Sequence, residues 1–299
     1  MEKQNPTSAI ETGSSKRWQR FFHDLPGKSV VYILLSLWAG FSLFGFLWVV
    51  LTSLKTNREL FSIKTIFGLP ATLQWINYVR AWTHAKISYY FMNSIIVCIA
   101  SILLINLVAS MAAYILGRFK FRGVRPILIS LMLGMAIPIQ LIMIPVYLMY
   151  INIKLNNTLT GLILIYTTIS LPFTIFVLTG FFRSLPQELE EAAILDGASE
   201  FGVFWKVMMP LAMPGIITVT IFNFLGIWNE YMLAYLLIRT PDKNTIALGL
   251  YYLTWTQQYG ADWTGLFAGF VIIMIPSALA FLLLQNRITR GMTVGALKG

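Results

Sequence analysis

Charged side chains are scarce in this sequence. Only 11% of its 299 residues are charged and 57% are hydrophobic, whereas an ordinary soluble domain carries about 25% charged residues. Too few charges are present to cover a soluble surface, but such a balance is tolerated where lipid is the solvent. The composition therefore excludes a soluble globular domain and predicts an all-α protein that crosses a membrane several times.

Cysteine and histidine are also nearly absent. The single cysteine, Cys98, lies inside an apolar run, so one chain can form no internal disulfide and no metal cluster on it. The two histidines, His23 and His84, are far apart and lack the spacing of metal ligands. We therefore expect neither a metal site nor a cofactor.

The net charge of +10 has two interpretations, a nucleic-acid surface or basic cytoplasmic loops. The basic residues stand between apolar runs and form no basic stripe interleaved with aromatic residues. Lys and Arg gather in the cytoplasmic loops of membrane proteins. We therefore expect a lipid bilayer around the chain and no nucleic-acid partner.

Six apolar stretches are long enough to cross a bilayer, which takes roughly 20 residues. We place the six transmembrane helices at 30–52, 91–117, 126–150, 158–182, 211–238 and 264–286. These bounds leave an amino-terminal tail at 1–29, a loop at 53–90 and a carboxyl-terminal tail at 287–299. Pro138 and Pro145 interrupt the third stretch, and kinked membrane helices can line cavities.

The distribution of basic residues predicts the orientation. The connection after the second stretch holds four of them, Arg118, Lys120, Arg122 and Arg125, and the next connection holds only Lys154. Short basic loops stay in the cytoplasm. We therefore expect both termini and the segment 183–210 on the cytoplasmic side, and the loop 53–90 on the outer side.

The segment 183–210 is acidic, with five of the chain's twelve carboxylates. Ser184 and Gln187 have the spacing of a capping box, which predicts the start of a helix. Gly197 can end that helix and Ser199 can cap a second one. The pattern predicts a helix, an elbow and a helix, which either form a solvated loop or dock in a groove of another protein.

A sequence resemblance bears on this choice. Glu191–Ala193, then Gly197, then Val207–Pro210 resembles the EAA loop of binding-protein-dependent ABC importers, with Val-x-Met-Pro where Ile-x-Leu-Pro is usual. The segments Trp228–Tyr231 and Gly291–Gly299 are similar to the carbohydrate branch of that family. The closest type is the second permease subunit of maltose-type sugar importers, over the chain from about residue 77 to the end.

The resemblance implies an ABC importer type I permease fold in a bacterial or archaeal inner membrane, with its core at 91–286. It implies a heterodimer with a second permease, two separate ATP-binding subunits and an external sugar-binding protein, so the chain itself is expected not to be an enzyme. The implied ATPase-coupling residues are Glu188, Glu191, Ala192, Ala193, Asp196, Gly197 and Pro210, and the implied tail contacts to the ATPase are Thr293, Gly295, Lys298 and Gly299.

Glu230 is the only acidic residue within a predicted span. A charge at the bilayer centre costs about 2.5–3.5 kcal/mol on insertion scales, so such residues face a cavity or a partner. One interpretation places it on the sugar path, with Gln140, Asn223, Trp228, Asn229 and Glu230 as candidates. In the other, Glu230 lies near the outer interface or pairs with the second permease.

Three alternative functions belong to different classes. An ABC permease for another small solute, such as amino acids or polyamines, would share the EAA loop. A secondary transporter or channel would need intramembrane ion ligands or two inverted repeats, and neither is seen. A membrane enzyme would need a nucleophile with a base, or clustered metal ligands, within the spans.

Overall fold

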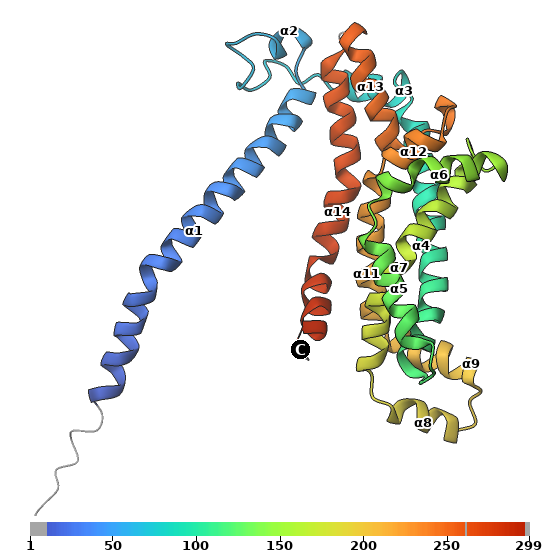
Figure 1. Ribbon diagram of the computed structural model, residues 1–299. Coiled ribbons are helices and arrows are strands. Elements are labelled where there is room, and N and C mark those ends of the chain that lie inside the picture. Colours follow the sequence, from blue (N-terminus) through green and yellow to red (C-terminus); the bar gives the residue numbers. More distant parts are fainter. Residues whose placement is uncertain (1–10, 261, 297–299) are drawn as a thin grey trace, which may run out of the picture.

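The computed structural model describes residues 11–260 and 262–296, and within these ranges every regular element is a helix (Figure 1). Four helices contain a continuous apolar part long enough to span a membrane: α1 (Glu11–Ser53), α4 (Ile87–Arg118), α7 (Leu159–Ser184) and α14 (Trp263–Ala296). Their apolar parts are Ser29–Ser53, Ile87–Arg118, Leu159–Ser184 and Trp263–Leu283. The predicted spans at 30–52, 91–117, 158–182 and 264–286 correspond to these four.

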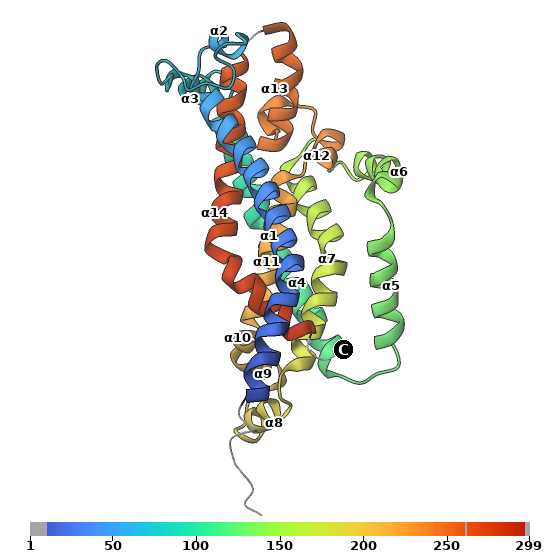
Figure 2. The same ribbon diagram turned by 90° about the vertical axis from the view of Figure 1, so that its left-hand side faces the viewer.

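The third predicted span is not one helix. It is divided into α5 (Val124–Ala136) and α6 (Ile139–Asn152), whose axes are bent by 98° at the break. Pro138 follows Ile137 in the extended connection; proline has no N–H to donate and disfavours helical geometry at the residue before it. The expected interruption at Pro138 is present, but it is a sharp bend between two helices rather than a kink within one, and α6 runs crosswise to α5 (Figures 1 and 2).

The fifth predicted span, 211–238, is also divided. Its main part is α11 (Met213–Asn229), which is bent by 71° from the helical segment Glu200–Leu211 before it. After α11 the chain becomes extended at Glu230, and a short helix α12 (Met232–Leu237) follows. If each bent pair counts as one span, the described part of the chain has up to six candidate spans, which agrees with the predicted all-α membrane fold.

The other elements lie at the two ends of the bundle (Figures 1 and 2). One end carries α2 (Asn57–Leu60), α3 (Ile76–Thr83), η3 (Pro241–Lys243) and α13 (Ile246–Gly260). The opposite end carries α8 (Glu188–Leu195), α9 (Glu200–Val203), the π-helical η2 (Phe204–Met208) and α10 (Met209–Leu211). This separation puts the acidic segment at one end and the loop 53–90 at the other.

The core of the bundle is built on α4 and α7, which pack along each other, with α11 against both. Buried side chains form two apolar clusters, one around Ile87, Leu162 and Trp228, the other around Phe182 and Met208. In contrast, α1 leans away from the bundle in Figure 1. Its apolar side chains from Val30 to Leu47 are largely exposed, as suits a helix surrounded by lipid or by another subunit.

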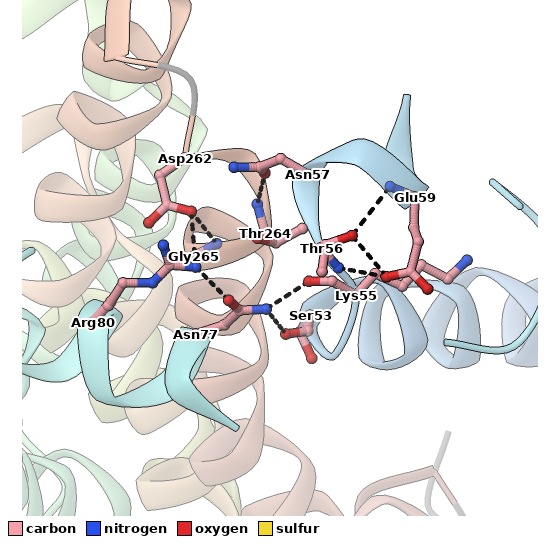
Figure 3. A network of polar contacts seen from close by, with 10 residues as sticks. All are labelled: Ser53, Lys55, Thr56, Asn57, Glu59, Asn77, Arg80, Asp262, Thr264 and Gly265. Atoms are coloured by element: carbon pink, nitrogen blue, oxygen red, sulfur yellow. Dashed lines mark hydrogen bonds and ion pairs between the residues drawn. The ribbon is translucent and has the colours of Figure 1, made fainter. Parts of the chain in front are cut away.

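A polar network joins the end of α1 to α3 and to the start of α14 (Figure 3). At its centre, the buried Asn77 donates its amide to the carbonyls of Ser53 and Lys55, both at 2.8 Å. Arg80 donates to the amide oxygen of Asn77 at 2.5 Å and approaches Asp262 at 3.5 Å. Two segments distant in sequence are therefore held together through one asparagine.

Two charged side chains order the connection after α1. Lys55 donates its ammonium to the carbonyls of Thr65 and Ile66 at 2.9 and 2.8 Å, and burial lowers the pKa of this ammonium. Glu59 accepts the backbone N–H groups of Thr56 and Ala71, both at 2.8 Å, and these bonds lower the pKa of its carboxyl. Hydrogen bonds in which one partner is charged are stronger than hydrogen bonds between neutral groups.

Asn77→Asp tests this network. Aspartate is nearly isosteric with asparagine, but it places a carboxylate oxygen where the amide NH₂ donates to two backbone carbonyls. Those buried carbonyls then lose their hydrogen-bond donor, which costs about 1–3 kcal/mol for an unsatisfied buried polar group. We expect a lower unfolding midpoint of the purified protein and faster proteolysis after α1. Asn152→Asp makes the same change at an exposed position and should alter neither the unfolding midpoint nor the rate of proteolysis. Equal behaviour of the two variants would contradict a stabilising role of the network.

Candidate functional site

The acidic segment forms the predicted helix, elbow and helix, with one difference at its start. Ser184 is the last residue of α7, and its hydroxyl donates to the carbonyl of Phe181 at 2.8 Å, so the predicted capping box with Gln187 does not form. The elbow is at Gly197, whose φ of +84° is in the left-handed region. Ser199 caps α9 by accepting the N–H of Gly202 at 3.2 Å. The predicted elbow and second cap are confirmed.

One arginine holds α8 against the bundle. Arg118, at the end of α4, contacts one carboxylate oxygen of Glu190 with Nε and Nη2, both at 2.9 Å. The same guanidinium donates to the carbonyls of Phe182 and Leu185 at 3.3 and 2.8 Å. The Arg118 and Glu190 side chains are only 9% and 14% exposed. We call this arrangement the Arg118 clamp; it joins α4, the end of α7 and α8.

The helices after the elbow are fixed to the same part of the bundle. Phe204 and Met208 of η2 are buried in the second apolar cluster. The Phe204 ring lies 5.1 Å from the ring of Tyr114 on α4, measured between centroids. The ring of Phe182 on α7 also packs against Tyr114, with centroids 5.6 Å apart. Because these side chains are closely packed, a displacement of η2 would also displace α4 and α7.

The outer face of α8 is open. Leu195 is 88% exposed and Ile194 is 55% exposed. The predicted coupling residues Glu188, Glu191, Ala192, Asp196, Gly197 and Pro210 are all exposed, and Ala193 is half-buried against the second cluster. Glu188, Glu190 and Glu191 lie in the first turn of α8, where the helix dipole favours negative charge.

A second feature is a cavity of about 610 Å³ among α5, α6, α7 and α11. Most of its wall is apolar, with polar groups from Tyr166, Thr168, Ser170, Asn223 and Glu230. Asn223 is buried and donates its amide to the hydroxyl of Thr174 at 3.0 Å. An apolar chamber with a few fixed polar groups is typical of small-molecule sites. We call it the α7–α11 cavity.

Glu230 is held firmly at the wall of this cavity. Its carboxylate accepts the hydroxyl of Tyr166 at 2.5 Å and the backbone N–H groups of Leu233 and Ala234 at 2.7 and 3.3 Å. It thereby satisfies the first turn of α12, whose N–H groups lack a partner in the preceding chain. These hydrogen bonds compensate for the break between α11 and α12, which the sequence did not reveal.

The other candidates for the sugar path lie elsewhere. Trp228 is 2% exposed, packs between Phe91 and Phe224, and donates its indole N–H to the carbonyl of Ile273 at 3.0 Å. Asn229 is exposed and bonds to the carbonyl of Leu225. Gln140 is exposed on α6 and does not line the cavity. Only Asn223 and Glu230 of the five candidates share it.

Two contacts at these candidate sites were not predicted from the sequence. The Arg118–Glu190 pair is separated by 72 residues, and Arg118 was interpreted only as part of a basic loop. Tyr166, the partner of Glu230, lies 64 residues before it in an apolar run. A tyrosine hydroxyl within an apolar run needs a hydrogen-bond partner when it is buried, and this was the signal in the sequence that could have pointed to a polar contact at Tyr166. Of the predicted tail residues, Thr293 and Gly295 lie in α14, and Lys298 and Gly299 lie outside the described residues.

Comparison with known proteins identifies the family. Residues 105–294 match the family model of the binding-protein-dependent transport system inner membrane component. The chain is 38% identical to the diacetylchitobiose uptake system permease protein of Streptomyces coelicolor, over 90% of this chain and 89% of that protein. It is 33% identical to the trehalose transport system permease protein of Mycobacterium tuberculosis, over 89% of this chain and 96% of that protein.

A solved structure has the same fold. It is the crystal structure of a bacterial ABC transporter involved in the import of the acidic polysaccharide alginate, and it matches with a TM-score of 0.76 and 23% identity. The match covers 88% of this chain and 97% of the other. The chain belongs to the binding-protein-dependent transport system inner membrane component family, as a non-catalytic, multi-pass permease subunit of an inner membrane.

Proposed function

We propose that this chain is the permease subunit of an ATP-driven carbohydrate importer, and that it couples ATP hydrolysis elsewhere to the movement of sugar. The observation that carries the proposal is the Arg118 clamp, which joins the exposed acidic helix α8 to α4 and α7. The relatives named for diacetylchitobiose and trehalose transport support the substrate class.

Coupling follows from the mechanics of the segment. ATP-binding subunits dock on the exposed face of α8, around Glu188, Glu191 and Ala192, and move it when they close. The clamp and the buried Phe204 transfer that motion to α4 and α7. Because α7 and α11 form walls of the α7–α11 cavity, the motion alters the chamber itself. The predicted tail contacts of Thr293, Gly295, Lys298 and Gly299 with the ATPase add to this docking.

The second permease completes the path. α1 stands away from the bundle with its apolar residues exposed, and a second permease supplies a surface for it. An external sugar-binding protein delivers cargo at the end of the bundle that carries α2, α3 and α13. Both termini and α8 lie in the cytoplasm in this arrangement, consistent with the basic residues Lys120, Arg122 and Arg125, which stand between α4 and α5 or at the start of α5.

Uptake into proteoliposomes that contain the complete importer tests the substrate class. We expect ATP-dependent accumulation of a labelled disaccharide or short oligosaccharide that depends on the binding protein. A labelled amino acid and a polyamine serve as matched cargoes. Accumulation of either in place of every sugar tried would favour the alternative, a permease for another small solute. Accumulation by this chain alone without ATP would contradict the ABC assignment.

Glu230→Gln tests the role of the α7–α11 cavity. The amide can keep its oxygen toward the N–H of Leu233 and turn its NH₂ toward the Tyr166 hydroxyl, which can accept instead of donate. Only the longer bond from the N–H of Ala234, at 3.3 Å, is then lost. The complex should therefore assemble in normal yield, while sugar transport falls about tenfold because the charged acceptor is lost. Complex yield, transport and sugar-dependent ATPase activity are measured together.

Tyr166→Phe is the matched variant, since it removes the hydroxyl and leaves the carboxylate able to accept from a sugar. It should retain more transport than Glu230→Gln. Loss of the assembled complex in Glu230→Gln would assign the carboxylate to structure alone, and unchanged transport would remove it from the path.

A further inference from the structure

A separate cavity of about 810 Å³ lies where α4 ends, α5 begins and α7 ends. Four basic side chains line it, Lys120, Arg122, Arg125 and Arg183. The rest of its wall is mainly apolar and extends along α5 through Leu128, Ile129 and Met132. It shares no lining residue with the α7–α11 cavity, and three of its four basic residues lie outside the segment 183–210.

The basic groups at this cavity have no counter-charge among the residues that the structure describes. Arg183 donates to the carbonyl of Leu116 at 3.2 Å, which leaves its positive charge uncompensated. Within the described side chains no ion pair or hydrogen bond is formed by Lys120, Arg122 or Arg125. Arg118, the basic residue at the end of α4, is in contrast paired with Glu190.

The position of the cavity indicates what can fill it. It stands at the same end of the bundle as α8, where the spans α4 and α7 leave the apolar region at Arg118 and Ser184. This end of α4 and α7 therefore lies at the depth of the lipid headgroups, and the acyl chains of such lipids extend along α5. Basic pockets between membrane helices at this level bind anionic headgroups, and each nearby Lys or Arg strengthens binding.

We infer that this cavity is a binding site for an anionic phospholipid, with its phosphate among Arg122, Arg125, Lys120 and Arg183 and an acyl chain along Leu128 and Met132. Charge complementarity selects the headgroup, and the apolar wall of α5 selects a lipid over a soluble anion. A lipid in this place would brace α5 against the ends of α4 and α7, next to the Arg118 clamp. The inference is independent of which solute is imported.

The test uses the complete importer in nanodiscs of phosphatidylcholine containing a small fraction of phosphatidylglycerol. Retained phosphatidylglycerol is counted by native mass spectrometry after release of the complex. Arg122→Gln combined with Arg125→Gln should reduce retention at this site about 25-fold, at about fivefold for each basic side chain removed. The matched control is Lys64→Gln combined with Lys154→Gln, which removes two exposed charges outside the cavity and should leave retention unchanged.

Three results would overturn the inference. The first is equal retention by the two double variants. The second is competition by free glycerol phosphate at the same concentration as the lipid, since the site would then take a soluble phosphate. The third is loss of the second permease or of an ATP-binding subunit from Arg122→Gln/Arg125→Gln with phosphatidylglycerol retention intact, since the cavity would then be a protein interface.

Discussion

Replacing Glu190 by glutamine is expected to separate ATP hydrolysis from transport while the chain still inserts in the membrane. The substitution removes the charge that pairs with Arg118 and leaves a guanidinium with a side-chain exposure of only 9%. Breaking one partner of such a buried pair costs about 3–5 kcal/mol. Since every 1.4 kcal/mol is tenfold in an equilibrium, transport per ATP hydrolysed should fall by at least about a hundredfold.

Glu188→Gln is the matched control for stability, because Glu188 lies in the same turn of α8 and is exposed. Its unfolding midpoint should equal that of the unmodified protein, whereas Glu190→Gln should unfold at lower temperature. The coupling ratio is measured in proteoliposomes as sugar accumulated per phosphate released. A normal ratio in Glu190→Gln would show that the clamp does not carry the motion of α8 to α4 and α7.

Gly197→Ala is expected to weaken coupling through the backbone alone. The glycine has φ of +84°, and a Cβ built there meets nothing within 4 Å, so no side-chain clash contributes. The left-handed conformation costs a residue with a Cβ about 1–2 kcal/mol. That difference corresponds to a factor of roughly 5–30, by which we expect transport per ATP to fall as the elbow changes its angle.

Two further variants separate this cause from others. Gly197→Asn should recover part of the transport, since asparagine tolerates the left-handed region better than alanine. Gly180→Ala adds the same methyl group in α7, where the space is also open and the backbone is helical, and it should leave transport unchanged. Equal transport by Gly197→Ala and Gly197→Asn would mean that the backbone angle at the elbow does not matter.

The spans could be predicted because lipid imposes length and apolarity on every crossing helix. The elbow could be predicted because Gly197 and Ser199 act on their own neighbours in sequence. The two broken spans were harder. Pro138 was recognised as an interruption, but the size of the bend depends on packing. At Glu230 the carboxylate that caps α12 also accepts from the hydroxyl of Tyr166, which the chain brings there from another helix.

The same reason limits prediction of the site. An exposed acidic helix can be expected from a run of carboxylates, and Glu188 and Glu191 were expected on it. Which carboxylate pairs inward cannot be read from the run, because Arg118 reaches Glu190 from the end of α4. Trp228 has the chemistry to stack on a sugar, yet the packing of α11 on α14 buries it.

The central claim is that α8 docks on the ATP-binding subunits in the cytoplasm, and site-specific cross-linking tests it most directly. Glu191→Cys places a thiol on the exposed face of α8, and the native Cys98 is buried and gives little background. Lys64→Cys marks the exposed loop at the opposite end of the bundle. In the assembled importer, Glu191→Cys should cross-link to an ATP-binding subunit. Lys64→Cys should be labelled by a membrane-impermeant thiol reagent when the reagent is added outside, and not when it is added inside. Labelling of Glu191→Cys from outside, or its cross-linking to the external binding protein, would contradict the account.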